Sequence, residues 1–560
     1  MNSYIQFKKA NCKNCYKCIR HCPVKSIKFS DNQANIVHDE CILCGMCFLA
    51  CPQNAKQIRN DVAKVKELIG SGRPVYASLA PSFVANYDGV SIKAMEKALQ
   101  GLGFFAAEET AVGAEIVNAQ YTAIMNREDT RVLISSCCHT VNSLIQKYYP
   151  QALQYLAKVM SPMQAHCSRI KQLYPDACTV FIGPCISKKE EADQYPGIVD
   201  CVLTFEELTD WFKQENIALE KVSDEPETGG KSRLYPTAGG IIRSMDGKEQ
   251  TVNYLVVDGV ENCIHALRDL IENNLPDQKC FIEMSACSGS CIGGPAMDRN
   301  HRTPVRDYMA VNGYARRKNF GVSAEAERLV KEIKPIHLSA AMPSEKEIRD
   351  VLVKMGKTSP EQELNCGSCG YNSCREKAVA VCRGKADLTM CLPFLKEKAE
   401  SFSDKVIGNT PNGIMVLNEE LEVQLVNKSA CRIMNIANPR DVIGSPVIRL
   451  LNPSDYVMAM DKPGSTHEAK NYFAEYGKYV EETIIYDRQY HIIISIMRDI
   501  TEEENRRIKK ETVSKDAVEI TDKVIEKQMR IVQEIASLLG ETTAETKIAL
   551  THLKESLKNE

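Results

Sequence analysis

The pattern of apolar and polar residues differs between regions of the chain. Between residues 70 and about 340, short apolar runs such as VYASLA, RVLIS and CVLTF alternate with amphipathic stretches such as SIKAMEKALQGLG. Apolar strands that alternate with helices predict an α/β domain with mostly parallel strands. A linker helix is expected just before this domain, near residues 61 to 70.

From about residue 402 the pattern changes. GIMVL and EVQLV flank a turn at NEEL, the helix-like NKSACRIMNI follows, and YVEETIIY and YHIIISIMRDIT close the region. Two strands, helices and then antiparallel strands resemble a PAS domain over residues 402–502, and the closing residues 498–501, RDIT, are the exit signature of such domains. The resemblance implies a sensory module, but no residue in it indicates a particular ligand.

The last region, residues 505–560, carries apolar or small side chains at spacings of three and four. Such a seam predicts a signalling helix that forms a coiled-coil or helical-bundle homodimer. A single amphipathic helix packed on its own domain would show a similar pattern. The seam weakens between Gly540 and Thr543, and its positions are Ile525, Met529, Val532, Ala536, Leu539, Thr543, Thr546, Leu550, Leu553 and Leu557.

Composition narrows the possible functions. The 560 residues leave room for three or four domains of roughly 150 residues each. The net charge of -3 leaves no basic surplus, so we expect no nucleic-acid partner. No apolar run approaches the roughly 18 residues that span a bilayer, and no signal peptide is evident, so we expect a cytoplasmic protein without a membrane span. In a reducing compartment, 24 cysteines indicate metal or redox chemistry rather than disulfides.

The strongest motif is a cysteine array that occurs twice near the amino terminus. Residues 12–23 read CKNCYKCIRHCP and residues 41–52 read CILCGMCFLACP. In this spacing the fourth cysteine of each array ligates the cluster of the other array. The arrays predict a ferredoxin-like domain over residues 1–60 with two 4Fe-4S clusters, one on Cys12, Cys15, Cys18 and Cys51 and one on Cys41, Cys44, Cys47 and Cys22. Zinc is the alternative.

Cysteines also recur after three apolar runs of the α/β region. RVLISSCC ends at Cys138, CTVFIGPC at Cys185, and CFIEMSACSGSC carries Cys287 and Cys291. Because α/β sheets bind ligands at the carboxyl ends of their strands, these four thiols could converge on a 4Fe-4S cluster or on zinc. Buried structural cysteines would give the same pattern. The adjacent Cys137 cannot readily pair with Cys138 in a disulfide, so it stays free if Cys138 is a ligand.

Three of these segments, SSCCHTVN, GPCISKKEE and MSACSGSCIGGP, resemble the active-site signatures of the FeFe-hydrogenases. The resemblance covers roughly residues 1–340. It implies an H-cluster, in which Cys138, Cys185, Cys287 and Cys291 hold a 4Fe-4S cluster. Cys291 would then bridge to a two-iron unit that carries carbon monoxide, cyanide and an azadithiolate.

The resemblance also implies roles for residues that are not ligands. Cys137 would pass a proton to or from the bridging amine, and Lys188 would hydrogen-bond one cyanide. Ser82, after Ala80 and Pro81 in SLAPSF, would help to hold the other cyanide. On pattern alone, Lys188 in KKEE could equally be a surface residue. Three further residues are expected near the cofactor, namely Met163, which could instead fill the core, Gly239 and Gly240.

Several positions depart from the pattern of the active members of that family. Gly183 and Ser285 stand where those members have methionines, and His139 replaces a proline. Tyr121 and Ile124 occupy the positions of two relay acids. Proton transfer needs a group of suitable pKa at each step. We therefore expect a slow hydrogenase.

A further cysteine set lies at residues 366–391. Its spacing resembles the small 4Fe-4S module of acetyl-CoA-pathway enzymes and implies Cys366, Cys369, Cys374 and Cys391 as ligands, with zinc as the alternative. Seven cysteines remain outside the motifs. We expect all seven, including Cys167, Cys201 and Cys431, to be small buried residues.

Together these features predict a multidomain α/β protein. Its parts would be a ferredoxin-like domain at 1–60, an H-cluster domain at 70–340, a 4Fe-4S module at 345–395, a PAS domain at 402–502 and a helix at 505–560. The favoured function is a sensory hydrogenase that cleaves H2 reversibly into protons and electrons. It would exchange electrons with ferredoxin or another carrier and signal to a separate kinase, phosphatase or regulator. A metabolic ferredoxin-linked hydrogenase and a non-catalytic Fe-S assembly or electron-transfer protein are the alternatives.

Overall fold

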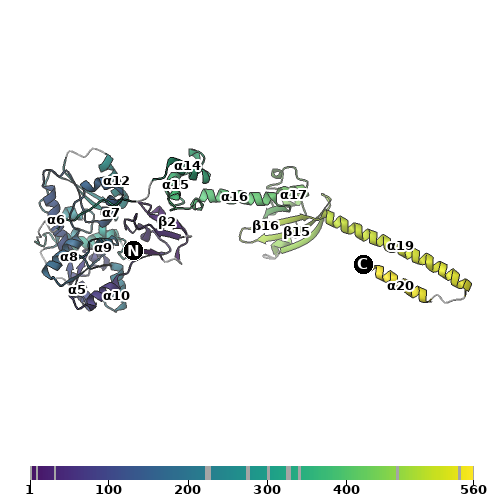
Figure 1. Ribbon diagram of the computed structural model, residues 1–560, viewed down its shortest axis with the longest axis horizontal. Helices are drawn as coiled ribbons and strands as arrows, with labels where there is room; N and C mark the ends of the chain where they lie inside the picture. Colours follow the sequence, from purple (N-terminus) through teal and green to yellow (C-terminus); the bar gives the residue numbers. More distant parts are fainter. Residues whose placement is uncertain are drawn as a thin grey trace. The chain divides into compact units, whose positions relative to one another are not determined.

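A computed structural model describes most of the chain (Figure 1). The described residues are 3–7, 11–30, 33–220, 229–272, 278–298, 303–322, 329–338, 342–461, 466–539 and 544–558. They form two compact units, Met1–Phe394 and Leu395–Glu560. Each unit is described by itself below.

The amino-terminal cysteine arrays fold into a small domain of paired strands and one-turn helices. The strand β1 (Ile5–Phe7) pairs with β4 (Lys56–Ile58), and β2 (Ile27–Ser30) pairs with β3 (Gln33–Ile36). The short helices α1 (Lys17–Arg20) and α2 (Met46–Leu49) each carry the third cysteine of an array. The two arrays thus fold alike, as their repeated spacing predicts.

Residue Gly45, just before α2, has a conformation and a neighbour that only glycine allows. Its φ of 74° lies in the left-handed region. A Cβ at this position would lie 2.5 Å from Cβ of Pro295, which follows the last predicted H-cluster cysteine. The amino-terminal domain therefore packs directly against the predicted H-cluster region at this point.

The α/β region contains two parallel sheets. One has the strand order β6-β5-β8-β9 and the other β10-β11-β7. The prediction of parallel strands is confirmed, and the division into two sheets is a new finding. The bounds are β5 (Val75–Leu79), β6 (Ala106–Glu109), β7 (Val132–Ile134), β8 (Cys178–Gly183), β9 (Cys201–Thr204), β10 (Asn253–Asp258) and β11 (Cys280–Ser285).

Helices connect and cover these strands. The helices α8 and α10 each begin with a capping box, in which Ser161 or Thr204 exchanges hydrogen bonds with the residue three positions later. The predicted linker helix is α3 (Val62–Gly70). The other bounds are α4 (Phe83–Asn86), α5 (Ile92–Gly101), α6 (Ala111–Met125), α7 (His139–Tyr148), α8 (Pro162–Leu173), α9 (Ser187–Gln194), α10 (Phe205–Gln214), α11 (Gly240–Ser244), α12 (Val260–Glu272) and α13 (Pro304–Tyr314).

The third cysteine set lies in a helical module at the end of the first unit. Its helices are α14 (Glu345–Lys354) and α15 (Cys374–Cys382). Buried residues of this module, including Cys369 and Tyr371, share one hydrophobic core with Cys18 and Cys22 of the amino-terminal domain. Helix α16 (Leu392–Asn409) begins immediately after Cys391 and continues into the second unit.

The second unit contains a five-stranded antiparallel sheet in the order β13-β12-β16-β15-β14. The predicted strands and helix form as β12 (Gly413–Asn418), β13 (Val423–Val426), α17 (Lys428–Ile433), β15 (Lys478–Asp487) and β16 (Ile492–Asp499), and α18 (Ser454–Asp461) also forms. The strand β14 (Thr466–Phe473) was not predicted. Its sequence, THEAKNYF, has too few apolar residues to reveal a strand.

The expected carboxyl-terminal seam is divided between two helices, α19 (Thr501–Leu539) and α20 (Ala544–Lys558), which contact each other (Figure 1). An ion pair of 3.2 Å joins Lys554 Nζ to Asp522 Oδ1 across this contact. The Gly540–Thr543 segment lies outside the described residues, as do the side chains of Ala536, Leu539 and Thr546. The single helix predicted for this region is therefore replaced by a pair.

Candidate functional site

The carboxyl ends of the strands β7, β8 and β11 meet at one cavity of the first unit. All four predicted H-cluster cysteines line it, and so do most of the other predicted site residues. The sequence-predicted residues in the lining are Ala80, Pro81, Ser82, Cys137, Cys138, Met163, Cys185, Lys188, Cys287 and Cys291. Convergence of side chains from positions 80 to 291 is what the strand-end argument predicts.

The thiols of the four cysteines are buried beside one another at this cavity. Burial, and then the neighbouring thiol of Cys185, raises the pKa of Cys138, and the same two causes raise the pKa of Cys287 and Cys291. A thiol with a raised pKa binds its proton at neutral pH unless a metal replaces it. Four thiols at one cavity are the donor set that a 4Fe-4S cluster needs, and cluster binding would replace their protons.

Two further groups in the cavity offer hydrogen bonds to an anionic ligand. Ser82 is fully buried, and its Oγ has no hydrogen-bond partner among the described residues. Lys188 Nζ donates to Cys137 O at 3.0 Å and to Glu191 Oε2 at 2.5 Å, which leaves one of its three donors for a ligand. Both groups can therefore donate a hydrogen bond to an anionic ligand in the cavity.

The free thiol Cys137 lies in a polar corner of this cavity. Tyr121 Oη is 3.1 Å from Cys137 Sγ and accepts a hydrogen bond of 2.9 Å from Ser136 N. Burial, and then the charge of Cys137, raises the pKa of Tyr121 well above its usual value, and burial raises the pKa of Cys137 to about 12. Tyr121 therefore remains a phenol at neutral pH and cannot release a proton as a carboxylic acid does.

A carboxyl group that the sequence analysis missed lines the same cavity. Glu283, in β11, is buried, and its Oε2 accepts a hydrogen bond of 3.1 Å from Ile242 N. Burial raises the pKa of Glu283 to about 7, and its charge acts on Cys137. The signal was an acid inside the apolar strand CFIEMS, four residues before Cys287. Glu283 is thus a carboxyl group near the free thiol that titrates near neutral pH.

Gly239 and Gly240 lie behind Glu283 and not in the cavity wall. A Cβ on Gly240 would lie 1.9 Å from Leu234 O, and Gly239 adopts a φ of 75°. These glycines form the tight start of α11, whose backbone N–H groups bind the Glu283 carboxylate. Their expected close approach to the cofactor stays a prediction.

Lys188 belongs to a buried network of ion pairs with Glu191 and Lys331. Glu191 is fully buried and bridges Lys188 Nζ and Lys331 Nζ, each at 2.5 Å, and Ser161 Oγ donates to it at 3.1 Å. Although burial raises it, the pKa of Glu191 lies far below its usual range because the two ammonium groups stabilise the carboxylate. Overall, Glu191 raises the pKa of Lys188 despite burial. Lys188 is held as a cation in the cavity wall.

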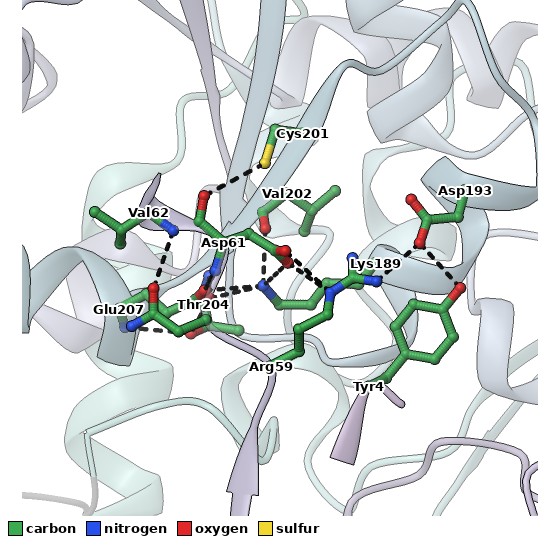
Figure 2. Close-up of polar contacts among 11 residues, drawn as sticks. Tyr4, Arg59, Asp61, Val62, Lys189, Asp193, Cys201, Val202, Thr204 and Glu207 are labelled. Atoms are coloured by element: carbon green, nitrogen blue, oxygen red, sulfur yellow. Dashed lines mark hydrogen bonds and ion pairs between the residues drawn. The ribbon is translucent and has the colours of Figure 1, made fainter. Parts of the chain in front are cut away.

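The next residue, Lys189, anchors the same helix on its other side (Figure 2). Its Nζ is fully buried and donates to Asp61 Oδ2 at 2.6 Å, to Glu207 Oε1 at 3.0 Å and to Val202 O at 3.0 Å. Arg59 Nε extends the network from the amino-terminal side by donating to Asp61 Oδ2 at 3.0 Å. The network fixes α9, and with it Lys188, relative to the preceding domain.

His139, which follows the paired cysteines, also faces the cavity. Its Nε2 lies 3.1 Å from Glu190 Oε2, while Nδ1 has no partner among the described residues. Gly183, at the end of β8, leaves no space for a side chain, because a Cβ there would lie 2.8 Å from the Phe181 ring. Two of the positions that depart from the hydrogenase pattern, His139 and Ser285, thus line the cavity.

The amino-terminal cysteines separate into the two predicted crossed sets. One pocket is lined by Cys22, Cys41, Cys44 and Cys47, and another by Cys12, Cys15, Cys18 and Cys51. Within the described residues, no three cysteine, histidine or acidic side chains gather closely enough to hold a single ion. The grouping of the thiols into these two pockets therefore agrees with the crossed sets that the spacing predicts.

Six of the seven cysteines outside the motifs are buried as expected, including Cys167, Cys201 and Cys431. Cys382 is exposed, so the prediction is wrong for this residue. It lies at the end of α15, where the helix meets solvent.

Comparison with protein families gives three matches. Residues 73–295 match the iron only hydrogenase large subunit, C-terminal domain. This region belongs to the FeFe-hydrogenase family. Residues 4–52 match the family described as 4Fe-4S dicluster domain. Residues 362–393 match the family described as 'Putative Fe-S cluster'. The fold class predicted from the cysteine spacings is thereby supported for the first unit.

Two curated hydrogenases are similar to the chain. Iron hydrogenase 1 of Clostridium pasteurianum is 26% identical over 308 residues, and the match covers 43% of this chain and 53% of that protein. The NADP-reducing hydrogenase subunit HndD of Solidesulfovibrio fructosivorans is 24% identical over 339 residues, and the match covers 48% of this chain and 58% of that protein. The chain thus spans about half the length of these relatives.

Solved structures give weaker likenesses. An FeFe-hydrogenase of Chlamydomonas reinhardtii is 15% identical, with a TM-score of 0.38, and covers 48% of this chain and 92% of its own. The PAS domain of an HTR-like protein from Haloarcula marismortui is 16% identical, with a TM-score of 0.17, and covers 19% of this chain and 95% of its own. These scores are too low to support a conclusion.

None of the helices in the described residues is long and apolar enough to cross a membrane.

Proposed function

We propose that the protein is a sensory FeFe-hydrogenase that cleaves H2 reversibly at low turnover. The observation that carries the proposal is the single cavity that collects Cys138, Cys185, Cys287 and Cys291 together with Cys137 and Lys188. The sensory part is supported by the order of strands and helices in the second unit, which follows the predicted PAS pattern. The long helix α19 begins within two residues of the last strand of that sheet.

An H-cluster bound in this cavity would supply the iron at which H2 is split into a hydride and a proton. Cys138, Cys185, Cys287 and Cys291 would hold it, and Ser82 Oγ and the free donor of Lys188 would bind its anionic ligands. The apolar wall formed by Met163, Phe181 and Pro162 excludes water from this space. These residues orient the group and keep the cavity dry.

Cys137 Sγ is the first protein group of the relay in this proposal: because burial raises its pKa to about 12, the thiol already carries a proton, which it gives up as it takes up the new one. Tyr121 Oη, at 3.1 Å, orients the thiol and cannot hold the proton itself. The Glu283 carboxylate, with a pKa of about 7, is the group that accepts the proton next. A relay with one titrating carboxyl group in place of the two expected acids is consistent with slow turnover.

The electrons would leave through the amino-terminal domain. The charge of Cys44 contributes to raising the pKa of Cys287, so the two cysteine sets lie within electrostatic reach. A ferredoxin or another electron carrier would exchange electrons with these clusters. A second copy of the chain and a separate kinase, phosphatase or regulator remain proposed partners of the second unit.

The deciding experiment is infrared spectroscopy of anaerobically reconstituted protein with and without H2. Stretches of metal-bound carbon monoxide and cyanide that shift under H2 would support the H-cluster, and a parallel turnover assay would separate a sensor from a metabolic enzyme. No such bands after maturation with a synthetic two-iron cofactor would refute both hydrogenase readings. The chain would then be an electron-transfer or scaffold protein.

A further inference from the structure

A line of polar side chains leads from the cavity wall towards the surface. Thr110 lines the cavity, and its Oγ1 lies 2.8 Å from Ser78 Oγ. Ser78 Oγ in turn lies 2.8 Å from His166 Nδ1, and His166 Nε2 lies 3.2 Å from Glu108 Oε2. The four side chains form one continuous line of hydrogen bonds, which we call the His166 chain.

The inner members of the His166 chain are buried in an apolar core. Ser78 and His166 are fully buried and Thr110 is 4% exposed, whereas the side chain of Glu108 is 33% exposed. Helix α6 approaches α8 so closely here that a Cβ on Gly113 would lie 2.7 Å from Cβ of His166. Buried polar groups cost free energy unless they are hydrogen-bonded, so each member depends on its neighbours in the chain.

The inner end of the chain lies beside the segment that is expected to bind a cyanide. Thr110 N donates to Leu79 O at 3.0 Å. Residues 80–82, which follow Leu79 at once, line the same cavity as Thr110 and include Ser82. Thr110 and Ser82 therefore belong to the same part of the cavity wall.

The His166 chain has two possible directions, because each hydroxyl has only one proton to donate. When Nδ1 of His166 is unprotonated, it accepts from Ser78, Ser78 accepts from Thr110, and Thr110 has no proton left for the cavity. When Nδ1 carries a proton, it donates to Ser78, and Ser78 donates to Thr110. The proton of Thr110 is then available to an acceptor in the cavity.

The carboxylate of Glu108 fixes the first of these directions. The hydrogen bond from His166 lowers the pKa of Glu108 against the effect of burial, and the charge of Arg169 lowers it further. Because a carboxylate only accepts hydrogen bonds, the proton of a neutral imidazole lies on Nε2 and leaves Nδ1 as the acceptor. One more proton on the His166–Glu108 pair places a proton on Nδ1 and reverses the chain.

The other groups around the chain do not change their charge near neutral pH. Those on β5, β6 and α8 are Tyr76, Glu109 with its ion-pair partner Arg233, Cys167 and Arg169. Burial raises the pKa of Cys167 to about 12 and also raises the pKa of Tyr76, so both keep their protons. A proton taken up here near neutral pH therefore binds the His166–Glu108 pair.

We propose that His166 controls whether Thr110 donates a hydrogen bond into the cavity, so that Thr110 joins Ser82 in binding an anionic ligand of the cofactor only after the His166–Glu108 pair takes up a proton. The inference rests on the proposed function for that ligand. One proton enters from solvent at Glu108, only N–H and O–H bonds change, and the proton returns to solvent when the pH rises. Thr110 is a binding residue in this scheme, and Ser78 and His166 are positioning residues.

The test is infrared spectroscopy of anaerobically reconstituted Glu283→Gln protein between pH 5 and pH 9. This background removes the carboxyl group whose pKa of about 7 would itself move the bands. A hydrogen bond to an anionic ligand withdraws electron density from the iron. The carbon monoxide and cyanide stretches should therefore move to higher wavenumber as the pH falls, along a one-proton titration curve.

Variants of the chain, made in the same background, identify the groups responsible. Thr110→Val keeps the shape of the side chain and should abolish the movement of the bands, whereas Thr110→Ser should keep it. His166→Gln should hold the bands at one position at every pH. The matched control is His265→Gln, which removes an exposed histidine of α12 and should leave the titration unchanged.

A second measurement uses the protein without the two-iron unit. Nitrogen magnetic resonance of labelled histidine, with His166→Gln to identify the signal by its loss, should show Nδ1 of His166 unprotonated at pH 9 and protonated at pH 5. The inference is overturned if His166 keeps one protonation state over this range, if the bands do not move with pH, or if they move equally in Thr110→Val. If His166 titrates as expected but no carbon monoxide or cyanide bands form, the proposed function fails, and with it the ligand, while the reversal of the His166 chain stands.

Discussion

The buried carboxylate of Glu191 gives the sharpest stability prediction. Glu191→Gln keeps the shape of the side chain and its contact with Ser161 but removes the negative charge that lies between Lys188 and Lys331. Both ammonium groups are then left in the interior, where the side chains of Lys188 and Lys331 are 11% and 2% exposed. The variant tests whether these three charges stabilise the wall of the cavity.

The magnitude follows from the burial. Removing one partner of a buried ion pair costs about 3–5 kcal/mol, because an uncompensated charge remains. We expect Glu191→Gln to lose this amount of unfolding free energy. The double variant Glu191→Gln, Lys331→Met should recover about 1–3 kcal/mol, since one of the two unpaired ammonium groups is gone.

The assay uses the one tryptophan of the chain. Trp211 is buried in α10, so its fluorescence during anaerobic urea unfolding reports the hydrogenase domain alone. The matched control is Glu332→Gln, which removes an exposed carboxylate next to Lys331 and should cost less than about 0.5 kcal/mol. Equal unfolding midpoints for the two variants at equal iron content would refute the reasoning.

Three further predictions concern the site. Cys137→Ser should lower H2 turnover at least about 100-fold while infrared bands of bound carbon monoxide persist; unchanged turnover would exclude the thiol as proton carrier. Because burial raises the pKa of Glu283 from 4.5 to about 7, its contribution to stability is complete below pH 4.5 and is lost as the pH rises through 7. The full loss is about 3 kcal/mol, of which about 2.5 kcal/mol falls between pH 5 and pH 8. The unfolding free energies from urea titrations at these two pH values should therefore differ by about 2.5 kcal/mol less in Glu283→Gln than in the parent protein. Cys22→Ser should remove the cluster that Cys44→Ser removes, with about four iron atoms lost in each; loss of the Cys12 cluster instead would contradict the crossed arrangement.

The sequence was sufficient for features that depend on local pattern. The cysteine spacings led to both amino-terminal sets and to the cavity, because each motif fixes the loop around its own ligands. The strands β5, β8 and β11 were evident because they are continuous apolar runs. The split into two sheets was not, since it depends on which strands pair across long connections.

Buried charges were the main features that the sequence concealed. Lys188 and Lys189 stand in KKEE, a pattern typical of a solvated surface, yet both are buried. The partners of Lys189, Asp61 and Glu207, are 128 and 18 residues away along the chain. Periodicity cannot indicate such pairs. Glu283 is different, because an acid within an apolar strand was a visible anomaly.

The close contact at Gly45 has a consequence for electron flow. Any side chain at this position would have to push Pro295 away. Cys44 precedes Gly45 directly and Cys291 lies four residues before Pro295, so we expect the gap between the two cysteine sets to widen. The probability of electron tunnelling falls steeply with separation. A substitution here would strain the backbone and widen the gap between the two domains, so electron transfer across it would slow even where the cysteines still bind their clusters.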